Sequence, residues 1–84
     1  MSEITAREAG KIVRWWLRDQ SIAGIIVTAK TIDFSDLARC SKVFVFLEGA
    51  FRVLTAEHWT MLDKLARDRG FLIHHFVYYR GKEA

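Results

Sequence analysis

Two stretches with helical periodicity, each introduced by a threonine, enclose a segment with the alternation of β-strands, all within 84 residues. A chain of this length forms one hydrophobic core, because it buries only about 60–65% of the surface that its unfolded form exposes. Helices and strands must therefore share that core. We expect a single α+β domain over residues 1–84, with two long helices packed on a small three-stranded mixed sheet.

The first helix is predicted to begin at Thr5. The sequence from Thr5 to Glu8 has the form of a capping box, in which the threonine side chain accepts from an early helical N–H and the glutamate reaches back to the threonine amide. The helix should run to about Asp19. Apolar residues recur every three or four positions on one side of it, which should pack on the core: Ala9, Ile12, Val13, Trp16 and Leu17.

The second helix is predicted between Thr55, as its N-terminal cap, and Gly70, as its stop. Glu57 lies in the first turn, where a negative charge interacts favourably with the helix dipole. The apolar side of this helix carries four residues: Trp59, Leu62, Leu65 and Ala66.

Three segments have strand character: residues 22–34, residues 42–53 with a bulge or bend at 49–50, and residues 71–79. A short helical turn is expected over residues 35–40. This connection is too short for a parallel crossover, so the first two strands should be antiparallel. The second helix allows a right-handed crossover that leaves the third strand parallel to the second. Strand orders 2-1-3 and 1-2-3 both satisfy these connections.

The strand alternation sorts the side chains of the sheet into two faces. The apolar face should support the helices: Ile25, Val27, Val43, Val45, Phe71, Ile73 and Val77. The opposite face is cationic and aromatic: Lys30, Phe44, Phe46, His74, Phe76, Tyr78 and Arg80. A helix could cover this second face, a homodimer could form through it, or it could bind DNA or RNA by stacking bases on its aromatic rings. These three alternatives stay open.

The histidines and the cysteine do not form a chemical motif. His74 and His75 are adjacent in a predicted strand, so they point to opposite faces and cannot bind one metal ion from the same side. Cys40 and His58 lie in distant segments, without the spacing of zinc ligands or the setting of an activated nucleophile. We therefore expect no enzymatic activity, no metal and no cofactor.

The single cysteine and the polar N-terminus favour a cytoplasmic location. One cysteine forms no internal disulfide, which is typical of proteins of the reducing cytosol. The first residues lack the apolar core of a signal peptide, and the longest apolar runs are far shorter than a membrane span. We expect no contact with a membrane.

The most specific candidate binding surface lies on the first helix. Its cations are spaced four, three and four residues apart, which aligns them in one row about 16 Å long at ~1.5 Å per residue: Arg7, Lys11, Arg14 and Arg18. Trp15 should lie beside this row, away from the core. Many charged helix faces only keep a protein in solution. The alternative is an anionic partner, either an acidic protein surface or a nucleic-acid backbone.

Two functions fit these features. The first is a non-enzymatic module that binds a larger protein or nucleoprotein complex with an acidic surface. Small aromatic-rich domains without catalytic motifs are similar in type to the inhibitors carried by mobile genetic elements, anti-CRISPR proteins among them. The second is direct nucleic-acid binding through the basic helix and the aromatic face. The net charge of +3 is low for a dedicated nucleic-acid binder, which favours the first function.

Overall fold

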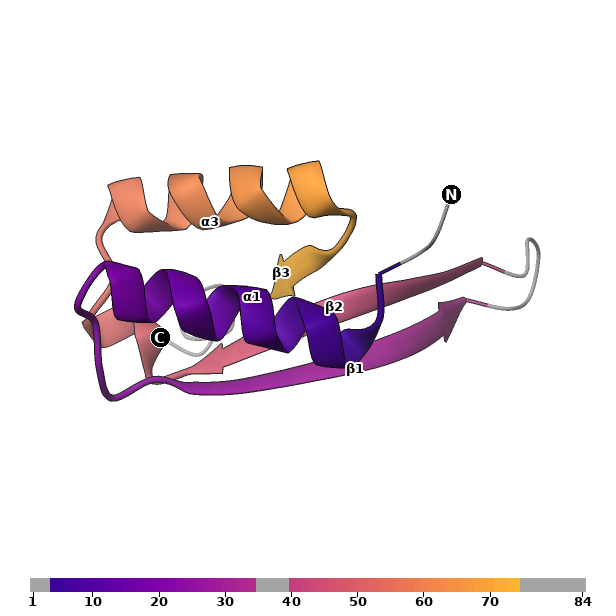
Figure 1. Cartoon of the computed structure of the whole chain (residues 1–84), viewed down its shortest axis with the longest axis horizontal. Helices are drawn as coiled ribbons and strands as arrows, with labels where there is room; N and C mark the ends of the chain where they lie inside the picture. The colour runs from indigo at the N-terminus through magenta and orange to yellow at the C-terminus, as the bar shows by residue number, and fades with distance from the viewer. Residues whose placement is uncertain (1–3, 35–39, 75–84) are drawn as a thin grey trace, which may run out of the picture.

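The computed structural model describes residues 4–34 and 40–74 of the chain and shows an α+β fold (Figure 1). Two helices of 14 residues each pack on one face of a three-stranded mixed sheet. The elements follow one another as α1 (Ala6–Asp19), β1 (Ile26–Phe34), β2 (Cys40–Glu48), a 3-10 helix η1 (Ala50–Arg52), α3 (Ala56–Arg69) and β3 (Leu72–His74). The predicted fold class is confirmed.

The sheet has the order β1-β2-β3, so β2 is the central strand. β1 and β2 are antiparallel, with Ala29 opposite Val45, whereas β2 and β3 are parallel, with Val45 opposite Ile73. Both strand directions agree with the prediction, and of the two possible orders the protein adopts 1-2-3. The hairpin thus leaves β1 at one edge of the sheet, as Figure 1 shows.

Helix α1 begins where its capping signal predicts. The Glu8 backbone N–H donates to Thr5 Oγ1 at 3.1 Å, and the Thr5 N–H donates to Glu8 Oε1 at 3.1 Å. This reciprocal pair satisfies two backbone N–H groups at the start of the helix, those of Thr5 and Glu8, which have no partner within the helix. The helix ends at Asp19, the predicted residue.

Helix α3 also has the predicted start and stop. Thr55 caps its N-terminus, and Gly70 ends it in the left-handed conformation (φ 92°), with its N–H donating to the Ala66 carbonyl at 2.8 Å. The capping box is completed by His58, whose Nδ1 accepts from the Thr55 N–H at 3.1 Å. The sequence pattern did not indicate this role, because glutamate or glutamine is the usual residue at that position.

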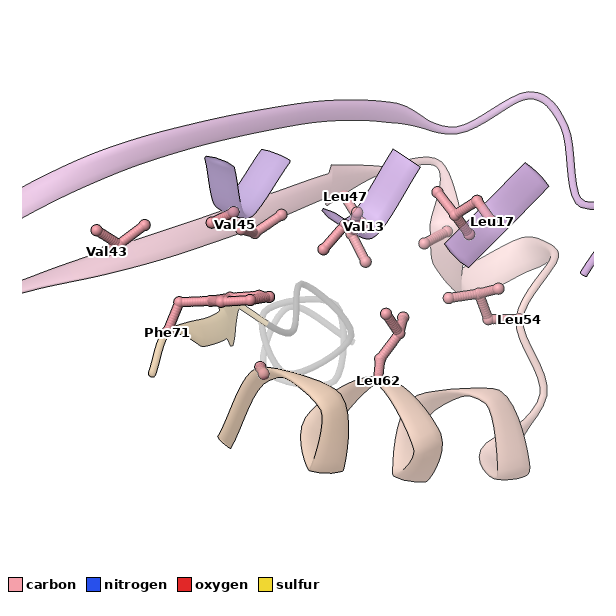
Figure 2. Close-up of a cluster of buried hydrophobic side chains, with 11 residues drawn as sticks. Val13, Leu17, Val43, Val45, Leu47, Leu54, Leu62 and Phe71 are labelled. Atoms are coloured by element: carbon pink, nitrogen blue, oxygen red, sulfur yellow. The ribbon is translucent and has the colours of Figure 1, made fainter. Parts of the chain in front are cut away.

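Both helices cover the same face of the sheet. Figure 2 shows Val13 of α1 and Leu62 of α3 pointing into one interior with the β2 side chains Val45 and Leu47. All four side chains are less than 2% exposed. Phe71, which precedes β3, closes the same cluster. The sheet therefore has one face that supports the helices and an opposite face that α1 and α3 do not cover.

The predicted second strand is wrong at both ends. It was expected over residues 42–53 with a bulge or bend at 49–50, but β2 begins at Cys40 and ends at Glu48, so the ladder is interrupted at the predicted place and does not resume. Gly49 adopts a left-handed conformation (φ 86°), which L-residues with a side chain avoid, and turns the chain out of the sheet. The 3-10 helix η1 follows, and Leu54 then enters the core.

The remaining strand predictions differ in extent. Cys40 lies in β2 opposite Phe34, so the helical turn predicted over residues 35–40 is wrong at its last residue, and residues 35–39 lie outside the described part. The third strand is described for Leu72–His74, and the predicted remainder up to residue 79 lies outside that part. No helix in the described segments is long and apolar enough to cross a membrane.

Candidate binding surfaces

The cations of α1 line its outer side. All four side chains are exposed and lie within an arc of about 60° at ~3.6 residues per turn: Arg7, Lys11, Arg14 and Arg18. We call this row the basic stripe. The opposite side of the helix contributes Ala9, Val13 and Leu17 to the core. The periodicity of the α1 sequence thus places the residues that pack in the core on one side of the helix and the cations on the exposed side.

The two adjacent tryptophans of α1 have different surroundings. Trp16 is half-buried, and the edge of its ring meets the His58 ring at a centroid distance of 5.9 Å and an interplanar angle of 84°. Trp15 points outward and is 58% exposed, with Lys11 Nζ at 5.8 Å from its ring centroid. Trp16 therefore joins the two helices, whereas Trp15 belongs to the surface of the basic stripe.

The described carboxylates do not neutralise the basic stripe. Within residues 4–34 and 40–74, the ion pair that forms is Lys64–Asp68 on α3, with an N–O distance of 3.7 Å between two exposed side chains. Glu8, the acidic residue of the first turn of α1, binds Thr5 in the capping box. The stripe therefore presents its charge to solvent and to any molecule that approaches α1.

One cation of the stripe, Arg14, lies close to the sheet. If residue 10 had a β-carbon, it would lie 3.6 Å from both Arg14 Nη1 and the β-carbon of Ala29 in β1. The Arg14 guanidinium therefore lies over buried Gly10, beside the edge strand. Figure 1 shows α3 on one side of α1 and the free edge of β1 on the other. Sequence periodicity alone does not show this proximity, because it comes from the packing of α1 on β1.

The second face of the sheet gathers the described members of the predicted aromatic face. The Phe46 and His74 ring centroids are 4.8 Å apart, those of Phe44 and Phe46 are 6.5 Å apart, and Lys30 Nζ lies 5.9 Å from the Phe46 ring. Phe76, Tyr78 and Arg80 lie outside the described residues. The strand alternation thus places these four side chains together, on the side away from α1 and α3.

A shallow hollow of about 390 Å³ adjoins this aromatic group. Thr28, Phe46 and Phe51 line it together with Glu48 and Gly49. The Glu48 carboxylate gives this end of the face a negative charge, which opposes the binding of a phosphate. The hollow therefore suits an apolar group better than a nucleic-acid backbone.

The described histidines have structural neighbours rather than a chemical cluster. His58 completes the α3 cap and contacts Trp16, and His74 packs on Phe46. His75 lies outside the described part of the chain, as does the side chain of Cys40. Among the side chains that are described, no three of His, Cys, Asp or Glu lie close enough together to hold a metal ion.

Comparisons with known proteins give no relative for this chain: no protein-family model, no curated protein and no solved structure matches it.

Proposed function

We propose that this protein is a binding module that acts by occupying an acidic surface of a larger protein or nucleoprotein complex through α1. One observation carries the proposal. The basic stripe and the exposed Trp15 form one continuous outer face of a helix, and no described carboxylate pairs with its cations. Tryptophan and arginine are also the residues most enriched among those that dominate binding energy at protein interfaces.

The two kinds of side chain in this face have different roles in binding. The cations attract an acidic surface over a distance of about 8–10 Å at physiological ionic strength, which raises the rate of encounter and fixes the orientation. Trp15 supplies apolar area that leaves water on contact, and it loses little conformational freedom because its side chain has two rotatable bonds. A partner should therefore combine carboxylates or phosphates with an apolar depression for the indole.

Such a module inhibits a complex when the surface that it covers is needed for another contact. An inhibitor of the anti-CRISPR type blocks a nucleic-acid-handling complex. Its basic stripe would either occupy the acidic site of a competing basic partner or contact the bound nucleic acid. This mode of action agrees with the fold, because the inner side of α1 packs in the core while its outer side is exposed.

The double variant Trp15→Ala/Arg14→Glu tests the proposal. The variant is used to capture the partner from a lysate of the native host, and the captured amount is quantified by mass spectrometry. This amount should fall at least about ten-fold, since hot-spot residues commonly contribute about 1–2 kcal/mol or more each. The matched control is Met61→Ala/Arg69→Glu on α3, which also truncates one exposed apolar side chain and reverses one charge. The control should capture the partner as the unaltered protein does. Equal capture by the two double variants would contradict the proposal.

Direct nucleic-acid binding is the second candidate function, and the Lys30–Phe46 contact beside His74 and Phe44 favours it. That group and the basic stripe lie on opposite sides of the sheet, so one strand of nucleic acid reaches both only by wrapping around the β1 edge. Nuclease treatment of the lysate separates the two functions. Capture that survives the treatment supports a protein partner, and capture that disappears supports nucleic acid.

A further inference from the structure

The outer edge of β1 is a long strand edge. β1 spans nine residues at the end of the sheet order, and no described segment pairs with its outer side. In an antiparallel pair, every second residue of a strand directs its N–H and C=O toward the neighbour, and the residues between direct theirs outward. β1 therefore offers a row of backbone donors and acceptors to another strand.

The sequence protects this edge only lightly. Natural edge strands avoid uncontrolled pairing by being short, by carrying charged side chains or proline, or by directing charged side chains inward. β1 has no proline, and its charged residues are Lys30 and Asp33, both exposed. Ile26 is 60% exposed, the highest fraction among the large apolar residues of the described segments. The edge thus retains the features that allow a strand to be added.

The two sides of this edge differ in chemistry. On the helix side, the Arg14 guanidinium and Ala29 of β1 both lie close to Gly10 of α1, and the rest of the basic stripe follows along α1. On the other side, Ile26 and Ile32 lie on the same face of β1, because both are an even number of residues from Lys30. An added strand with alternating side chains would meet the stripe cations near Ala29 and, toward the end of β1, Asp33 on the helix side. On the other side it would meet Ile26 and Ile32 with Lys30 between them.

We propose that β1 pairs with an extended segment of the partner protein, whose side chains alternate between acidic residues facing α1 and apolar residues facing Ile26 and Ile32. This inference rests on the proposed function, since the same partner supplies the acidic surface for the basic stripe. Main-chain hydrogen bonds along β1 provide affinity in this mode of recognition, and the alternating side chains provide specificity.

A second copy of the chain fits this edge poorly. Pairing of two β1 strands would bring the α1 helices of both copies close together, and each carries the four cations of the basic stripe. Like charges close across an interface are repulsive. The carboxylates of an acidic strand would instead be attracted by the basic stripe. Charge complementarity therefore favours an acidic segment over a second copy of the chain.

The probe for this inference is a capped synthetic peptide of alternating glutamate and valine, as long as the nine residues of β1. Hydrogen exchange measured by NMR on the intact protein reports the pairing. Exchange should slow about ten-fold or more at alternate amides of β1 when the peptide is bound, because those amides gain hydrogen-bond partners. A second peptide of identical charge, with alternate backbone amides N-methylated, cannot form the ladder and should bind about ten-fold more weakly.

The variant Ile26→Lys separates strand pairing from simple charge attraction. The added cation would strengthen a purely electrostatic interaction with the glutamates. Strand pairing predicts the reverse, because the valine side of the peptide loses its apolar contact. The variant is expected to fold normally, since the Ile26 side chain is mostly exposed.

Three outcomes overturn the inference. Equal binding of both peptides with unchanged β1 exchange would show that β1 takes no strand, and it leaves the proposed function intact as long as capture still depends on Trp15 and Arg14. Protection of β1 that grows with protein concentration without peptide would assign the edge to a second copy. Absence of peptide binding would show that β1 does not bind an acidic strand. The proposed function has a separate test: it would be contradicted if capture of the partner did not depend on Trp15 and Arg14.

Discussion

At the scale of single residues, His58 has two structural roles. Its Nδ1 accepts from the Thr55 N–H at the start of α3, and its ring meets the ring of Trp16 on α1. The Thr55 hydroxyl in turn accepts from the His58 N–H at 3.2 Å. One imidazole therefore fixes where α3 begins and also joins the two helices.

Two substitutions of His58 separate these roles. Both His58→Gln and His58→Ala remove the ring contact with Trp16, but only glutamine retains a side-chain acceptor for the Thr55 N–H. We expect His58→Ala to be less stable than His58→Gln by about 0.5–1 kcal/mol, the usual contribution of a helix cap. Urea unfolding followed by circular dichroism measures the difference. Equal stability of the two variants would show that the cap contributes nothing.

At the scale of elements, α1 contains a glycine that its packing does not require. Gly10 is buried in the middle of the helix and has an ordinary helical conformation, since the glycines with positive φ are Gly24, Gly49 and Gly70. A β-carbon at residue 10 would make contacts of 3.6 Å with Ala29 and Arg14, an ordinary van der Waals distance. The site therefore has room for a methyl group.

Gly10→Ala should stabilise the protein by about 0.5–1 kcal/mol, because alanine loses less backbone entropy in a helix and fills the contact with Ala29. Gly70→Ala is the opposite control, since Gly70 has a φ of 92° and any β-carbon there is strained. We expect this control to lose about 1 kcal/mol. Thermal unfolding distinguishes the two variants. A Gly10→Ala variant that is less stable than the unaltered protein would show that α1 and β1 are packed more tightly than the distances indicate.

The elements also show which features of the fold can be read from sequence. Both helices carry local signals at their ends, a threonine cap and, for α3, a terminal glycine, so their bounds could be predicted. The end of β2 could not, because Gly49 is compatible with both a bulge and an exit from the sheet, and burial of Ala50 and Leu54 decides between them. The basic stripe follows from period alone, whereas the position of Arg14 beside β1 depends on tertiary packing.

At the scale of the whole molecule, the two helices and the sheet form two layers, and only one face of the sheet is used by the described core. The outer side of α1 and the second face of the sheet are therefore separate surfaces with different chemistry. The first combines cations with an exposed indole, and the second combines aromatic rings with Lys30 and Glu48. We propose that the partner binds to the first surface and to the β1 edge next to it.

A photo-cross-linking amino acid placed at Asp19 tests this assignment most directly. Asp19 is exposed at the end of α1, next to Arg18 and one turn beyond Trp15, so the substitution leaves every residue of the basic stripe in place. The same amino acid at Met61, which is 44% exposed on α3, is the control. We predict that irradiation in the native host links one partner protein to position 19 and little or none of it to position 61. Equal adducts from both positions, or adducts from position 61 alone, would contradict it.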